Sequence, residues 1–179
     1  ETQLTQAIAI ADIIHVEIQR SGSFIEPLTD YSHAFSRNQK FDALRGEKMI
    51  RDTYTATHGQ TMNQTREGLK ATEESLPEDA RARAFDHAEK VLRMIKEEPT
   101  QPYYQAIERG SAHFATEFGT TQNAAKALMK SVYDQHHAQD LYTTGKELEA
   151  KHHKPVRAAE IAARKADKLQ SRSQTQSMT

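Results

Sequence analysis

The stretch LTQAIAIADIIHVEI, residues 4–18, carries an apolar side chain at every third or fourth position. The residues of this series are Leu4, Ile8, Ala11, Ile14 and Ile18. Because an α-helix turns once every 3.6 residues, this spacing gathers the apolar side chains on one helix face. The stretch therefore predicts an amphipathic helix over residues 2–20.

Three more apolar residues, Ile10, Ile13 and Val16, widen the apolar face of this helix, so we expect it to be buried on more than one side. The same three-to-four spacing recurs along most of the chain. No alternating run of β-branched residues is long enough to indicate a sheet. The sequence predicts an all-α fold, an elongated antiparallel helical bundle with a long C-terminal helix and a short disordered basic tail.

Residues that start and end helices divide the first half of the chain. Ser36-x-x-Gln39 has the form of a capping box and predicts a helix over 37–58, after a connector marked by Pro27. Gly59 fits the end of that helix. Thr61-x-x-Gln64 either starts the next helix or lies within a bent continuation to residue 74.

Further signals follow in the second half. Ser75-Leu-Pro77-Glu78 predicts the start of a helix that ends before Pro99. Thr100 and Pro102 open another helix towards Phe118, which Gly119 ends in the left-handed conformation while Thr120 or Thr121 caps the next. That next helix is expected to run to about residue 153, with Gly145 as its one strong breaker.

Pro155 is expected to interrupt the helix, which resumes over 156–170 with alanine-rich spacing. The final residues, SRSQTQSMT at 171–179, have no apolar period and predict a disordered tail. We therefore divide the chain into a helical bundle at 1–155 and a basic, alanine-rich helix with a polar tail at 156–179.

Composition excludes several kinds of protein. Lys and Arg number 24 against 25 Asp and Glu, so no overall basic field attracts nucleic acid. The absence of cysteine rules out disulfides, thiolate metal sites and a cysteine nucleophile, and is compatible with the cytosol. No run approaches the ~20 apolar residues that span a bilayer.

The histidine-rich stretch VYDQHHAQDLYTTGKELEAKHHKP, residues 132–155, raises the question of a metal site. Carboxylates stand three residues before a histidine, as in helical di-iron proteins, in four pairs: Asp12 and His15, Asp30 and His33, Asp134 and His137, Glu149 and His152. In one continuous helix, however, the two His-His pairs would be ~24 Å apart and face nearly opposite sides.

The two His-His pairs cannot then share a metal unless the helix breaks at Gly145. We expect no metal site and no other cofactor. Instead, one of His136 and His137 should be hydrogen-bonded at a packed interface while the other faces solvent. His152 and His153 should lie in the last helical turn before Pro155. A helical metal-dependent or small-molecule-binding protein stays the alternative.

Catalytic motifs are missing from the sequence. There is no phosphate-binding G-x-x-x-x-G-K-[ST] loop and no G-x-S-x-G elbow, and the glycines are scattered singly. Tyr103 and Tyr104 at a helix start are typical of core residues. We therefore expect no catalytic residues and no enzymatic activity in this chain.

Charge is uneven near the C-terminus. Residues 146–172 carry eight basic groups against four acidic ones, and no acid follows Asp167. A basic helix with a polar tail can bind nucleic acid or a membrane surface, or can act as a sorting signal, although it is also typical of a solvated helix. It lacks the bulky apolar face of a membrane-inserting helix. We predict that the partner-binding residues are Arg157, Arg164, Lys165, Lys168 and Arg172.

Two segments, SRNQKFDALRGEKMIRDTYTATHGQT at 36–61 and DLYTTGKELEAKHHKP at 140–155, precede this basic end. Together with it, they resemble the C-terminal regions of bacterial conjugative relaxases and the related intracellular-delivery domains of type IV secretion substrates. The glycine-asparagine-proline signature of effector-type delivery domains and any relaxase catalytic motif are missing.

The resemblance implies a recognition module rather than a nicking domain. Its partner would be the secretion coupling machinery, with the basic residues of the tail as the translocation signal. It also implies a bacterial cytoplasmic protein that becomes a substrate for translocation. Nucleic acid stays an alternative partner through the same basic end.

Overall fold

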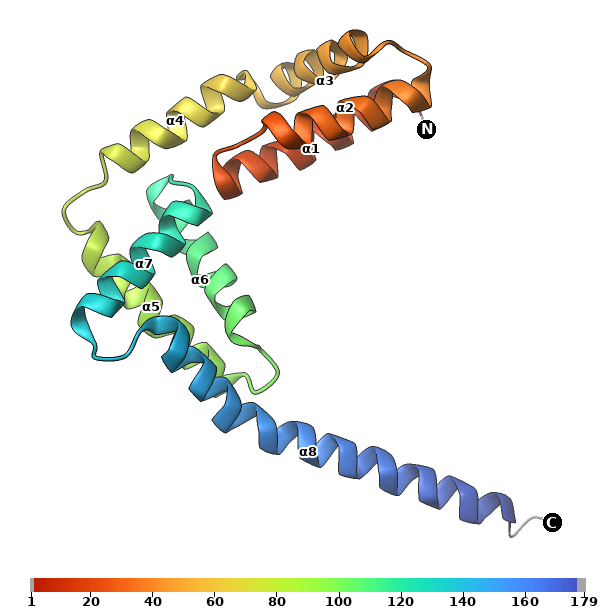
Figure 1. Cartoon of the computed structure of the whole chain (residues 1–179), viewed down its shortest axis with the longest axis vertical. Coiled ribbons are helices and arrows are strands. Elements are labelled where there is room, and N and C mark those ends of the chain that lie inside the picture. The colour runs from red at the N-terminus through yellow and green to blue at the C-terminus, as the bar shows by residue number, and fades with distance from the viewer. Residues whose placement is uncertain (1, 177–179) are drawn as a thin grey trace.

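The computed structural model describes the backbone of residues 2–176 and the side chains of residues 2–171. Over this backbone the chain forms eight α-helices and no strand (Figure 1). They are α1 (Gln3–Ser21), α2 (Ile25–Gln39), α3 (Ala43–His58), α4 (Met62–Glu74), α5 (Ala80–Glu97), α6 (Tyr103–Phe118), α7 (Gln122–His136) and α8 (Leu141–Gln176). The prediction of an all-α bundle with a long C-terminal helix is confirmed.

Local capping explains where several helices begin and end. The side chain of Thr61 accepts a hydrogen bond from the amide of Gln64, whose own side chain accepts from the amide of Thr61. This capping box confirms that α4 is a separate helix rather than a continuation. Gly59 ends α3 and Gly119 ends α6 in the left-handed conformation, as predicted, and Thr121 caps α7. Gly59 is left-handed as well.

The predicted start at Ser36 is wrong. Ser36 is buried inside α2, and Asp42 caps α3 by accepting a hydrogen bond from the amide of Arg45 at 2.8 Å. The expected connector around Pro27 is also helical, because Pro27 falls in the first turn of α2. A proline is tolerated there, since the first amides of a helix have no partner within it.

Ser75 ends α4 instead of starting α5. Its hydroxyl donates to the carbonyl of Ala71 at 2.8 Å, and its amide bonds to the carbonyl of Thr72. These contacts point the residue back towards the helix before it. Residues 75–79 form a turn, and α5 begins at Ala80.

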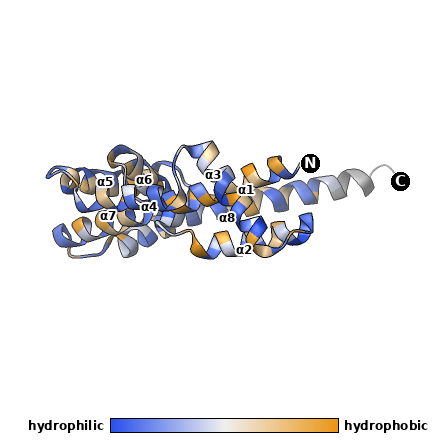
Figure 2. Ribbon diagram, turned by 90° about the horizontal axis from the view of Figure 1, so that it is seen from above, coloured by the Kyte–Doolittle hydropathy of each residue, from blue (hydrophilic) through white to orange (hydrophobic). Residues whose placement is uncertain are grey.

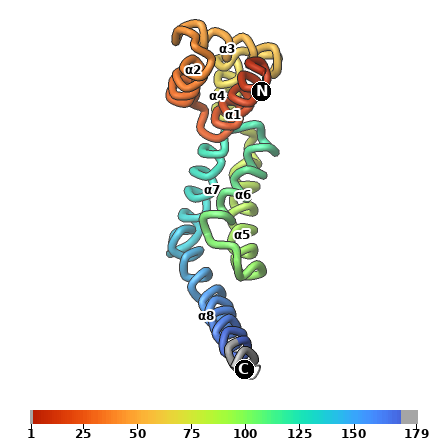
Figure 3. The backbone as a smooth tube through the Cα atoms, turned by 90° about the vertical axis from the view of Figure 1, so that its right-hand side faces the viewer, coloured from red at the N-terminus to blue at the C-terminus, as the bar shows by residue number. Residues whose placement is uncertain are grey.

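Buried apolar side chains form two separate clusters, which define two lobes within the predicted bundle. The N-terminal lobe consists of α1–α4, and its core includes Ile14, Ile18, Phe24, Ile50 and Tyr54. The C-terminal lobe consists of α5–α7 and the start of α8, and its core includes Val91, Ile95, Phe114, Met129 and Leu141. The two lobes and the outer part of α8 follow one another along the molecule (Figure 3).

Helix α1 is buried on one side only, which corrects the expectation of a wider buried face. Ala7, Ala11, Ile14 and Ile18 are fully buried, but Ile13 and Val16 are 45% and 62% exposed. α3 packs against both α1 and α2 on the buried side. Hydrophobic residues on α1 and α2 are marked orange in Figure 2.

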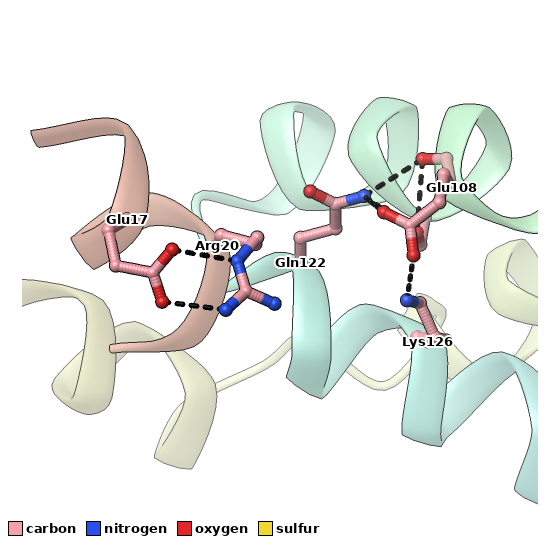
Figure 4. A network of polar contacts seen from close by, with 6 residues as sticks. Glu17, Arg20, Glu108, Gln122 and Lys126 are labelled. Carbon is pink, nitrogen blue, oxygen red and sulfur yellow. Dashed lines mark hydrogen bonds and ion pairs between the residues drawn. The ribbon is translucent and has the colours of Figure 1, made fainter. Parts of the chain in front are cut away.

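Ionic contacts lie where α1 of the N-terminal lobe meets α6 and α7 (Figure 4). Arg20 on α1 donates two hydrogen bonds to Glu17, at 2.8 and 2.6 Å. Glu108 on α6 accepts from Gln122 at 2.6 Å and pairs with Lys126, both on α7. The pKa of Arg20 is raised mainly by its hydrogen bond to Glu17. The Arg20–Glu17 pair lies within the N-terminal lobe and the Lys126–Glu108 pair within the C-terminal lobe.

Gly110 allows α5 and α6 to pack closely. A methyl group added at its α-carbon would lie 2.5 Å from Cγ2 of Val91 and 3.3 Å from Cε of Met129. Both neighbours belong to the core of the C-terminal lobe, where they have little room to move. By contrast, an added methyl at Gly68 on α4 would meet no atom within 4 Å.

We expect Gly110→Ala to destabilise the protein by about 1–3 kcal/mol, because the core must shift to accept the methyl group. Gly68→Ala is the matched control and should stabilise by about 0.5–1 kcal/mol through its higher helix propensity. Urea unfolding of both variants measures the two free energies. Equal effects at the two positions would contradict the close approach of α5 and α6.

Candidate partner-binding surface

The helix predicted from 121 to 153 is divided in two, at a place other than Gly145. α7 ends at His136, His137 is extended, and α8 begins at Leu141. Asp140 accepts a hydrogen bond from the amide of Thr143 at 2.6 Å, which is the arrangement of an N-cap residue. The aspartate directly before an apolar helical series was the local signal of this start, and the sequence prediction missed it.

The first turns of α8 are fixed to the C-terminal lobe by residues four positions apart. Leu141 is fully buried in the core of the lobe. One turn later, Gly145 lies against the ring of Tyr103 on α6, in a space that an added methyl group would fill. Gly145 is therefore a helical residue at a close helix contact, and the prediction that it breaks the helix is wrong.

The next two turns continue this anchor. The carboxylate of Glu149 accepts a hydrogen bond from the amide of Tyr103 at 2.9 Å and so caps α6. Burial would raise the pKa of Glu149, but the bonds from Tyr103 and Lys146 outweigh it and lower the pKa. His153 is 3% exposed, and its Nε2 lies 3.3 Å from the carbonyl of Ile95 on α5.

Beyond this anchor, α8 continues without interruption through Pro155, contrary to prediction. Pro155 and Lys151 are both exposed, so water can bond to the Lys151 carbonyl that the proline leaves without its helical partner. The predicted disordered tail is helical over 171–176, and residues 177–179 lie outside the described residues. Each residue from 157 to 171 is exposed.

The predicted partner-binding residues lie on this exposed part. At about 100° per residue, Arg157, Arg164, Lys165 and Lys168 share an arc of roughly 100° around the helix, centred near Ile161. The carboxylates of Glu160 and Asp167 occupy positions outside that arc. The side chain of Arg172 lies outside the described residues. The structure therefore brings four of the five predicted bases to one exposed helix face.

The carboxylate–histidine pairs have other roles in the fold. Asp134 accepts a hydrogen bond from the amide of Leu141, and Glu149 accepts from Tyr103. Asp12 lies 3.1 Å from His58 on α3. Among residues 2–171, no group of three or more His, Asp or Glu side chains is placed to hold a metal ion.

The first His-His pair partly matches the prediction. His136 donates from Nδ1 to the carbonyl of Val132 at 2.8 Å, as a hydrogen-bonded histidine. Its neighbour His137 stacks on the ring of Tyr133 with ring centroids 4.2 Å apart. Both side chains are exposed, so neither lies at a buried interface.

A polar network in the N-terminal lobe was not predicted. The hydroxyl of the fully buried Tyr54 donates to Thr65 at 3.0 Å and lies 2.8 Å from Nδ1 of His15. His15 also stacks on His58, with centroids 4.0 Å apart. Burial raises the pKa of Tyr54. The hydrogen bonds of Tyr54 thus join α1, α3 and α4, while the buried Nε2 of His58 makes no hydrogen bond.

Comparison with known proteins does not assign the chain to a family. No family model matches the chain, and no curated protein or solved structure shows significant similarity to it. Within the described part of the chain, each helix is too short or too polar to cross a membrane. The functional interpretation therefore rests on the exposed basic face of α8.

We expect Glu149→Gln to destabilise the protein by about 1 kcal/mol at neutral pH, because α6 loses a charged cap. The pKa of Glu149 is lowered below its ordinary 4.5, so its stabilisation is full above that value and is lost as pH falls through the folded pKa. Urea unfolding of wild type and variant should therefore give curves that converge in acid.

Glu160→Gln is the control for that measurement. It removes the same charge from the exposed part of the same helix and should change stability by less than about 0.5 kcal/mol at any pH. A constant difference between wild type and Glu149→Gln across the pH range would show that the Glu149 charge does not cap α6.

Proposed function

We propose that this chain is a protein-interaction module whose helical lobes hold the basic face of α8 out to a partner. The resemblance of its sequence to relaxase C-terminal regions makes that partner the coupling machinery of a type IV secretion or conjugation system. The basic face would then act as the translocation signal. The observation that carries this proposal is the exposure of every residue from 157 to 171.

The energetics of helix formation support the binding of another molecule by this part of α8. An isolated helix of this length is marginal in water, because most helical stability in proteins comes from packing. The described side chains from 157 onwards gain no burial from the two lobes. A partner that covers the helix would supply the missing contacts, and an acidic partner would also gain from the four bases.

Charge reversal tests the proposal. In the full chain fused to a reporter, we expect Arg157→Glu, Arg164→Glu, Lys165→Glu and Lys168→Glu together to lower transfer into recipient cells at least about tenfold, since charge-assisted contacts each contribute 1 kcal/mol or more. The thermal unfolding midpoint should stay unchanged, because these side chains are exposed.

The matched control is Lys165→Arg with Lys168→Arg, which keeps the charge and should keep transfer. Removal of 156–179 should likewise leave the lobes folded and abolish transfer. Transfer that persists after either the charge reversal or the truncation would contradict the proposal.

The same face also supports a second candidate partner, nucleic acid. Four bases on one helix face can contact successive phosphates, and such binding weakens steeply with salt. Fluorescence anisotropy with labelled duplex DNA separates the two candidates. Salt-sensitive DNA binding that is lost on charge reversal, with transfer unchanged, would assign nucleic acid as the partner. No observation on the described residues favours the metal-dependent alternative.

A further inference from the structure

An open groove runs between α1 and α2 on the side away from α3. At one end it encloses about 740 Å³ and is lined by apolar and acidic side chains. The apolar residues are Ile13, Val16, Pro27 and Tyr31, and the acidic residues are Asp12, Glu17, Glu26 and Asp30. Glu17 already bonds to Arg20 and Asp12 lies 3.1 Å from His58, so Glu26 and Asp30 on α2 are the carboxylates that a basic helix would meet.

The groove has the length and the surroundings that suit a helix. It continues past Tyr31 towards Thr5 on α1 and Asn38 on α2. Thr5 and Glu17 are twelve positions apart on α1, which corresponds to roughly 18 Å of helix. Because α3 packs against the other side of both helices, a helix in the groove would be added to the lobe on the face of α1 and α2 that α3 leaves open.

The outer part of α8 has a face complementary to this groove. Ile161 and Leu169 are 55% and 68% exposed and lie eight residues apart, with Lys165 midway between them on the same side. Ala158 and Ala162 beside them are small enough to allow close approach. Arg157 and Lys168 occupy one flank, and the two acids of this segment occupy positions on the far side of the helix.

We propose that the outer part of α8 of one molecule docks into the α1–α2 groove of a second copy. Ile161 and Leu169 would cover the apolar floor, and the bases would meet the carboxylates at its rim. The helix projects from the opposite end of the molecule to the groove, so its own groove is out of reach (Figures 1 and 3). Docking is therefore between molecules.

Two assemblies follow from this contact. Two molecules can exchange their α8 helices around a two-fold axis, or each can bind the next in a head-to-tail series. In both, self-association covers the face that binds a partner, so the two compete. The inference rests on the same exposed face of α8 as the proposed function, but it does not depend on which partner that function involves.

Sedimentation velocity of the full chain over a concentration series tests the docking. At low salt we expect the average mass to rise with concentration, and at high salt to return towards that of one chain, because the contact is charge-assisted. Glu26→Lys with Asp30→Lys in the groove should weaken association at least tenfold. Lys165→Glu with Lys168→Glu on α8 should do the same.

Mixing the two reversed chains separates docking from misfolding. In a mixed pair, the lysine-substituted groove of one chain meets the glutamate-substituted helix of the other, and the unchanged groove meets the unchanged helix. Both contacts then join opposite charges, so association should return to at least the wild-type level. Glu73→Lys with Glu74→Lys on α4 makes the same charge change away from the groove and should associate like wild type.

Three results would overturn the proposal. A wild-type chain that stays monomeric at every concentration would leave the groove to a basic helix of another protein. Association that survives groove reversal would place the contact elsewhere, and a mixture that fails to associate would exclude pairing of the two charges. Transfer into recipient cells plays no part in this experiment, so its outcome is independent of the proposed function.

Discussion

The attachment of α8 to Tyr103 determines how the rest of this molecule can act. The ring of Tyr103 receives Gly145, and its amide donates to Glu149, so one residue of α6 holds two successive turns of α8. Leu141 and His153 extend the contact by one turn on either side. Because an α-helix is stiff, fixing these turns sets the direction of the exposed turns that follow.

Local signals in the sequence predicted the elements that depend on near neighbours. Thr61 and Gln64 cap each other across three residues, and Gly119 ends α6 by its own backbone conformation. Ser36 and Ser75 carry the same kind of signal, yet one is buried within a helix and the other ends one. For such residues, the packing of the neighbouring segments decides the outcome, and no three-residue pattern contains that information.

The candidate site was predictable to a similar degree. The four bases on α8 could be identified from spacing and charge, because exposed charged residues need no partner in the fold. The roles of Glu149 and His153 could not, since the atoms that they contact lie 46 and 58 residues away in the chain. Ile13 and Val16 were expected in the core, because an apolar residue at a groove has the same helical spacing as one that is buried.

The two lobes thus hold the first turns of α8 in place and leave the basic face of its outer part uncovered. Hydrogen exchange of the monomeric chain, at a dilution below any self-association, tests this directly. Amides at 141–153 should exchange only through global unfolding of the C-terminal lobe, whereas amides at 157–170 should exchange faster through local opening. Equal slow exchange in both segments would show that the lobes cover the outer part of α8, and would contradict the account.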